Sequence, residues 1–247
     1  MKKTLFILGI MLLSLGLHAQ TVDEIINNYL ENTGGVANWA KLNSVKLEGK
    51  VAVQGMDLPI EMMQTKEGKM YMKFQLQGQE IVQQAFDGNE AWGINFMTMK
   101  PEISDAETSE NMKRNLGDFP DPFLNYKEKG FKAELLGKET VDGTETFKVK
   151  LTKKPLVVDG KEVENLVYYF FDTENFVPIM VEQEVKYGPA KGITSQTIYS
   201  DYQEVDGLYF PFAITEKAKG TTQSQAINIT KVTTNPVVDD AAFKIKD

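Results

Sequence analysis

The sequence predicts a mainly β protein: an unclosed (half) antiparallel β-barrel of about ten or eleven strands, with an N-terminal helix and a helical insertion. From Ser44 onward, apolar residues alternate with polar ones in successive runs, which is the period of strands with one covered face. Asp-Gly pairs separate several of these runs, at 87–88, 142–143, 159–160 and 206–207, and favour tight antiparallel turns. A meander of this many strands is expected to curl, because flat sheets of that width are uncommon.

The first element is predicted to be an amphipathic helix. Thr21 and Glu24 form a capping-box pair, and Gly34-Gly35 ends the segment. The apolar residues fall at i, i+3, i+4, i+7 and i+8: Val22, Ile25, Ile26, Tyr29 and Leu30. This spacing lines one face of the helix with apolar side chains.

One strand run supplies a candidate wall for a ligand cavity. Its apolar residues share one face of the sheet: Met70, Met72, Phe74 and Leu76. The other candidate ligand-binding residues are aromatic: Trp92, Phe96, Tyr168 and Phe170. Trp92, which lies ahead of Phe96, is either a packing anchor, the favoured interpretation, or a residue facing the cavity mouth. Residues 167–171 make a strand that is apolar on both faces. Methionine suits varied apolar partners, although ordinary core filling explains any single Met equally well.

The alternation stops between about residues 98 and 130, where prolines and a short helical window appear. Ser104 with Glu107 forms a second capping-box pair, and Lys113 and Arg114 suit the end of that helix. The candidate lid residues in this insertion are Met112, Leu116, Phe119 and Phe123. The insertion is either a movable lid or a fixed plug over the open end of the barrel, and the sequence leaves both open.

The N-terminus has the parts of a secretory signal peptide: Lys2-Lys3, an apolar run over 5–13, and small residues before Ala19. We expect cleavage after Ala19, which leaves 20–247 as a single domain in the periplasm. The apolar run is shorter than the ~20 residues that span a bilayer. No cysteine follows it for lipid attachment.

Composition argues against most enzyme chemistry. The chain has no Cys, and its one His, His18, lies in the expected signal peptide. A Ser-His-Asp or Cys-His nucleophile is therefore not available, and no cofactor or metal site is expected. Two acidic pairs, Glu182 with Glu184 and Asp239 with Asp240, are interpreted as solvated surface. We expect a protein that is not an enzyme.

The charge balance excludes some partners. Loss of Lys2 and Lys3 leaves 25 basic residues against 35 acidic ones, a net charge of −10. Nucleic acid and anionic membrane surfaces are held mainly by clustered Lys and Arg, so neither is expected as a partner. We expect a monomer.

Several turn and aromatic segments follow one another in a distinctive order after the first helix: FDGNEAW at 86–92, YKEKG at 126–130, LLGKETVDG at 135–143, YYFFD at 168–172 and YSDYQEVDGLYFPF at 199–212. Together with the signal peptide and the insertion, this order resembles the outer-membrane lipoprotein-sorting family, the carriers called LolA and their relatives. The resemblance covers essentially the whole mature chain. It implies an unclosed barrel, a helical lid or plug, and a hydrophobic cavity that holds acyl chains.

Two departures from that family are visible. The sorting carrier uses a buried Arg on an early strand to tie its lid, whereas this chain has a single Arg, Arg114, within the insertion itself. The membrane-anchored receptor of the same fold is a lipoprotein, and this chain lacks the Cys for that. The resemblance is therefore closer to the free carrier.

The sequence thus predicts a soluble periplasmic carrier that buries acyl chains of lipoproteins or other lipids and shuttles them toward the outer membrane without chemical turnover. Its expected partners are the acylated lipoprotein or lipid and transient inner-membrane and outer-membrane partner proteins. The alternative is an envelope-stress sensor or an assembly and interaction protein that uses the same lipid-binding fold without transport.

Overall fold

The structure, a computed structural model, describes residues 20–53, 55–188 and 190–245. The expected signal peptide, 1–19, lies outside the described residues. The strands are β1 (Ser44–Val53), β2 (Met56–Thr65), β3 (Met70–Leu76), β4 (Gln79–Phe86), β5 (Ala91–Asn95), β6 (Lys100–Ile103), β7 (Lys132–Val141), β8 (Thr144–Thr152), β9 (Leu156–Val158), β10 (Lys161–Val163), β11 (Leu166–Asp172), β12 (Pro178–Glu184), β13 (Thr194–Val205), β14 (Leu208–Ala218) and β15 (Ser224–Thr234). The helices are α1 (Val22–Asn32), α2 (Val36–Trp39) and α3 (Ala106–Arg114), with the 3-10 helices η1 (Leu116–Asp118) and η2 (Asp240–Phe243).

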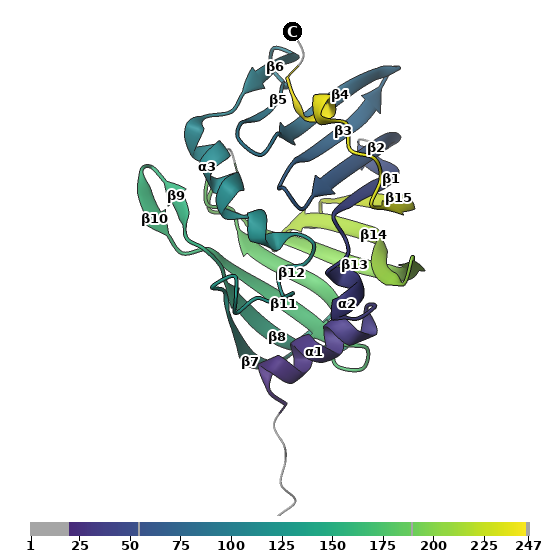
Figure 1. Cartoon of the computed structure of the whole chain (residues 1–247), viewed down its shortest axis with the longest axis vertical. Helices are drawn as coiled ribbons and strands as arrows, with labels where there is room; N and C mark the ends of the chain where they lie inside the picture. The colour runs from purple at the N-terminus through teal and green to yellow at the C-terminus, as the bar shows by residue number, and fades with distance from the viewer. Residues whose placement is uncertain (1–19, 54, 189, 246–247) are drawn as a thin grey trace, which may run out of the picture.

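In the described part of the chain, one antiparallel sheet of 13 strands curves through the molecule in the order β6-β5-β4-β3-β2-β1-β15-β14-β13-β12-β11-β8-β7 (Figure 1). Because β1 pairs with β15, the first and last strands of the chain join the two halves of the sheet. The order leaves β6 and β7 as two unpaired edges, so the sheet is an unclosed barrel as predicted. In Figure 1, α3 and the separate β9–β10 hairpin lie on the side between the two halves.

The strand count was too low. The alternating runs all became strands, but β6, β9 and β10 were not predicted. These strands have three or four residues each, and β6 is exposed along its whole length and contains Pro101. Strands this short do not display a period of two, and their pairing depends on neighbours that local sequence does not specify.

Helix α1 begins and ends as its sequence predicts. The Thr21 side chain accepts a hydrogen bond from the Glu24 amide, and the Glu24 side chain accepts one from the Thr21 amide. The helix ends at Asn32 and buries one face in the main core, formed by Ile25, Ile26, Tyr29 and Leu30. The capping box therefore sets the start of α1, and the apolar stripe sets its packing.

The four Asp-Gly pairs lie at turns between antiparallel neighbours, as predicted: β4–β5, β7–β8, β9–β10 and β13–β14. At three of them both residues have positive φ; in the β9–β10 turn φ is 53° for Asp159 and 72° for Gly160. Positive φ at both positions matches the twist of two-residue hairpins. The turn chemistry therefore fixes the register of these strand pairs.

The two faces of the sheet differ in chemistry. The concave face holds the main hydrophobic core together with α1 and α2. The opposite, convex face of β1–β4 carries cross-strand ion pairs; for example, Lys73 Nζ lies 3.2 Å from Glu61 and 2.9 Å from Glu80. These pairs are partly solvent-exposed and individually worth little. Alternation of side chains thus gives an apolar inner face and an outer face that carries ion pairs beside two smaller buried clusters, one containing Trp92 and the other Phe170.

No helix in the described ranges is long and apolar enough to cross a membrane.

Candidate ligand cavity

A cavity of about 440 Å³ lies on the concave face, between the sheet, α1 and the segment that follows η1. Its lining is largely apolar and aromatic: Tyr29, Trp39, Leu42, Val45, Leu47, Met62, Gln64, Met72, Pro120, Asp121, Pro122, Phe123, Tyr169, Pro178, Thr197, Tyr199, Tyr202, Tyr209, Phe210, Pro211, Ile214, Glu216 and Ile227. These residues come from both halves of the sheet. Curvature brings them to one space, because strands distant in sequence turn the same face inward.

Two smaller spaces adjoin this cavity. A cleft of about 290 Å³ under α3 and η1 shares Gln64 with the cavity. A space of about 330 Å³ shares Asn115 and Tyr187 with the cleft and Thr197 with the cavity. The shared lining residues make the three spaces neighbours, and together we call them the connected cavity.

The four residues of β3 that were predicted to form one cavity wall do not line one common space. Met72 lines the cavity and Met70 lines the cleft. The strand continues past the cavity, with Phe74 still paired in regular register to Ile60 of β2. Phe74 lines a separate small pocket, and neither Phe74 nor Leu76 lines the connected cavity.

The four aromatic candidates do not line the connected cavity. Trp92 belongs to a second buried cluster with Tyr71 and Phe243, where its Nε1 donates a hydrogen bond to the Phe243 carbonyl at 2.8 Å. Phe96 is 60% exposed in the β5–β6 turn.

Tyr168 and Phe170 point to the convex face, Phe170 into a third cluster with Val141 and Met180. Their neighbour Tyr169 lines the cavity instead. The β11 strand is apolar on both faces, so its sequence could not decide which set turns inward.

The insertion consists of two parts with different environments. Met112, Leu116 and Phe119 line the cleft, with Leu116 close enough to Gly68 that a Cβ there would overlap it. Phe123 is 2% exposed and packs against Tyr169, with ring centroids 4.7 Å apart. The α3–η1 part covers the cleft, and the part around Phe123 belongs to the main core.

Helix α3 starts one residue later than predicted. Its N-cap is Asp105, whose Oδ1 accepts a hydrogen bond from the Thr108 amide at 2.6 Å, and Ser104 is not the cap. The Glu107 side chain instead accepts hydrogen bonds from the Asp159 and Gly160 amides in the β9–β10 turn. Glu107 therefore ties α3 to the hairpin rather than closing a capping box.

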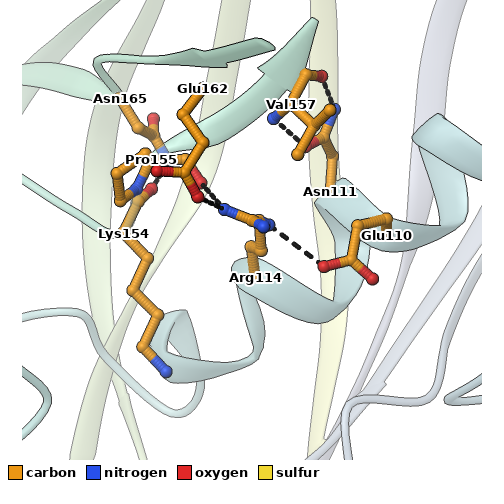
Figure 2. Close-up of polar contacts among 8 residues, drawn as sticks. All are labelled: Glu110, Asn111, Arg114, Lys154, Pro155, Val157, Glu162 and Asn165. Carbon is orange, nitrogen blue, oxygen red and sulfur yellow. Dashed lines mark hydrogen bonds and ion pairs between the residues drawn. The ribbon is translucent and has the colours of Figure 1, made fainter. Parts of the chain in front are cut away.

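Polar contacts fasten α3 to the β9–β10 hairpin (Figure 2). Asn111, which is fully buried, donates to the Val157 carbonyl and accepts from the Val157 amide, both at 2.7 Å. Arg114 lies 3.1 Å from Glu110 and 2.7 Å from Glu162, and donates to the Pro155 carbonyl at 3.0 Å. The helix is thus held by hydrogen bonds and ion pairs.

No family model matches the sequence, and no curated protein does. Solved structures do match. A LolA superfamily protein from Nitrosomonas europaea has a TM-score of 0.53 at 12% identity, over 92% of this chain and 99% of that chain. A domain described as an outer membrane lipoprotein-sorting protein, from Vibrio parahaemolyticus, has a TM-score of 0.54 at 12% identity, over 89% of this chain and 94% of that chain. This chain has a LolA-like fold. The predicted resemblance is confirmed at the level of the fold, which is what identities this low can show.

Within this LolA-like fold, the insertion is fastened differently from the arrangement that the resemblance implied. Arg114 lies on α3 itself and contacts the β9–β10 hairpin through the Pro155 carbonyl and Glu162 (Figure 2). The ion pairs with Glu110 and Glu162 raise the pKa of the Arg114 guanidinium further above its ordinary value. The insertion is therefore held by contacts between α3 and the β9–β10 hairpin, two segments that lie outside the 13-stranded sheet.

Buried hydroxyl and carboxyl groups in the cavity were missed by sequence reasoning. The Tyr29 hydroxyl donates to Asp121 Oδ2 at 2.6 Å, and the Phe123 amide donates to Asp121 Oδ1 at 2.8 Å. Burial raises the pKa of the Asp121 carboxyl, although both hydrogen bonds oppose the shift. Burial also raises the pKa of Tyr169 and Tyr202 well above the ordinary value. The polar inner residues of β13 gave no alternating signal that could have marked them.

Glu182 and Glu184 each contact a basic side chain. Glu182 is 6% exposed, contrary to its interpretation as solvated, and lies 3.0 Å from Lys219 Nζ and 2.6 Å from the Gln196 side-chain amide. Glu184 pairs with Lys186 at 2.8 Å. Over the described ranges, no group of three or more acidic, His or Cys side chains is placed to hold a metal ion. The cavity has largely apolar walls with scattered polar groups.

Proposed function

We propose that this protein is a periplasmic carrier that buries the acyl chains of lipoproteins or other lipids in the connected cavity and shuttles them toward the outer membrane. The observation that supports this most is the cavity itself: about 440 Å³ of space behind walls of Leu, Ile, Met and aromatic side chains. It adjoins a cleft beneath α3 and η1 through which a chain would pass. Binding proceeds without chemical turnover.

Burial of hydrocarbon supplies the binding free energy. Each methylene group removed from water contributes about 0.8 kcal/mol, so a chain of several carbons is held tightly. Tight binding implies slow escape, because affinity differences appear mainly in the dissociation rate. Release therefore requires a partner protein at the receiving membrane or movement of α3 and η1.

Export and surface charge fit the same role. The expected signal peptide directs the chain to the periplasm with cleavage after Ala19. The negative net charge keeps the carrier off anionic bilayers between exchanges with its inner-membrane and outer-membrane partners. The carrier acts as a monomer.

The test is native mass spectrometry of the protein purified from its own periplasm. We expect a co-purifying acylated mass with the wild-type protein. Ile214→Asp places a charge on the cavity wall, whereas Thr215→Asp places the same charge on the opposite face of β14. The acylated mass should disappear with Ile214→Asp and persist with Thr215→Asp, provided circular dichroism shows both variants folded. Absence of any acylated mass from the wild-type protein, or its equal retention by both variants, would contradict the proposal.

A second candidate, an envelope-stress sensor or assembly protein, is favoured by one observation. The β5–β6 turn exposes three large apolar side chains: Phe96 at 60%, Met97 at 96% and Met99 at 50%. Exposed apolar side chains that gather in one place are typical of protein contact sites. If Phe96→Ser with Met97→Ser alters an envelope-stress response while lipid binding stays at the wild-type level, the sensor function takes precedence over transport.

A further inference from the structure

Glu216 lies on the cavity wall. It follows Ile214 by two positions on β14, so both side chains point to the concave face, and both line the cavity. Across the strand pair it faces Thr197 of β13, which lies where the cavity meets the adjoining space. Glu216 is exposed to solvent, so it lies at the open edge of the connected cavity, between polar cross-strand partners, Thr197 and Gln225, and the apolar wall at Ile214.

The other described charged residues that line the connected cavity all have partners. Lys69 pairs with Asp240 and Asp118 with Lys153, both at 2.5 Å, and Glu184 pairs with Lys186 at 2.8 Å. Asp121 accepts hydrogen bonds from the Tyr29 hydroxyl and the Phe123 amide.

Glu216 alone among these described lining residues has no ion pair, and no side chain or amide donates a hydrogen bond to its carboxylate. A second acceptor without a donor lies in the adjoining cleft, where Asp118 Oδ1 is buried without a hydrogen bond.

The surroundings of Glu216 respond to its charge. The Glu216 side chain is solvent-exposed at the edge of the cavity, and partial desolvation by the surrounding wall raises the pKa of its carboxyl, with no cation opposing the shift. Burial, followed by the charges of Glu216 and Asp121, raises the pKa of Tyr199 to about 12. Among the described residues no basic side chain pairs with Glu216, so its carboxylate remains an uncompensated negative charge at this edge of the connected cavity.

We propose that Glu216 selects ligands that carry a primary ammonium group next to their acyl chains and disfavours ligands with a carboxylate head. This inference rests on the proposed carrier function and names the ligand class of the same cavity. An ammonium group supplies three hydrogen-bond donors and a positive charge. The Glu216 carboxylate and the neighbouring Thr197 hydroxyl are acceptors for such donors, and the carboxylate has no cation of its own. Acyl chains occupy the apolar part of the cavity, and the ammonium group lies at Glu216 and Thr197.

The test compares three probes of one chain length: dodecylamine, dodecanol and dodecanoate, below their critical micelle concentrations, by isothermal titration calorimetry. A charge-assisted hydrogen bond in a partly desolvated site should make the amine bind about tenfold more tightly than the alcohol. Dodecanoate should bind more weakly than dodecanol. In Glu216→Gln the amine should lose this advantage while dodecanol affinity stays the same.

The matched control is Glu174→Gln, which removes the same charge from an exposed turn between β11 and β12. It should leave all three affinities unchanged. Equal binding of the three probes, tighter binding of dodecanoate, or an amine preference that survives Glu216→Gln would overturn the inference while leaving the carrier function intact. If none of the three probes binds the wild-type protein, the carrier function itself fails.

Two molecules could supply the ammonium group: a diacylated lipopeptide with a free α-amine, or phosphatidylethanolamine. The lipopeptide is compared with its N-acetylated form, and phosphatidylethanolamine with phosphatidylglycerol. Loss of binding on N-acetylation assigns the site to the lipopeptide, whereas a preference for the ethanolamine lipid over the glycerol lipid assigns it to a phospholipid. Equal affinity within both pairs, the lipopeptide with its N-acetylated form and the ethanolamine lipid with the glycerol lipid, would overturn the inference.

Discussion

Asn111→Ala should loosen α3 from the β9–β10 hairpin. Asn111 is fully buried and makes two 2.7 Å hydrogen bonds to the backbone of Val157. The substitution removes both bonds and leaves the Val157 amide and carbonyl without these partners. At about 1 kcal/mol per bond, plus part of the cost of unsatisfied groups, local opening of α3 should become about 2–3 kcal/mol easier.

The assay is native-state hydrogen exchange of the α3 amides, such as Ser109 and Asn115, whose protons are held by carbonyls within the insertion. Their exchange should accelerate by roughly 30- to 150-fold, since about 1.4 kcal/mol corresponds to a factor of ten. Asn28→Ala, at an exposed position of α1, is the control and should leave α3 exchange unchanged. Unaltered α3 protection in Asn111→Ala would show that apolar contacts over the cleft, rather than the hairpin, hold the helix.

Three further outcomes are expected. Phe123→Ala should lower the free energy of unfolding in urea by about 3–5 kcal/mol, because the ring is buried in the core. Leu116→Asp should change the free energy of unfolding by less than about 1 kcal/mol and weaken binding of a neutral alkyl probe. The reverse pattern would show that η1, and not the Phe123 segment, is the structural plug. Burial raises the pKa of Asp121, so the native state keeps its proton to higher pH than the unfolded chain, and stability should fall as pH rises from about 3.9 through the raised pKa. Asp121→Asn should abolish that fall in urea unfolding measured across acidic pH, and an unchanged profile would rule out this carboxyl as its source. The mature protein should begin at Gln20 and leave cells on osmotic shock; N-terminal sequencing that finds the full-length chain in the membrane fraction would refute cleavage.

Local features of the sequence were sufficient for most of the strands and for α1. Alternation with a period of two, ended by Asp-Gly turns, depends on neighbours a few residues away, so it can be read without tertiary information. The capping box of Thr21 and Glu24 is equally local and was found intact. Helix α3 was placed correctly but its cap was not, because Glu107 bonds the distant β9–β10 turn instead of Ser104.

The candidate site could be predicted less well, because alternation groups side chains into two sets without saying which set faces inward. Met70 and Met72 reached the connected cavity, whereas Tyr168 and Phe170 lie on the other face of β11. A strand that is apolar on both faces offers no local cue to choose between them.

The sequence by itself determined the secondary structure, the turns and the antiparallel class, since these follow from interactions within a few residues. The tertiary structure decided which faces enclose the cavity, which part of the insertion is core and which part covers the cleft. Those outcomes depend on contacts such as Tyr29 with Asp121 and Trp92 with Phe243, 92 and 151 residues apart in sequence. Such contacts exist only after the sheet has curved and β1 has paired with β15, and no local pattern encodes that geometry.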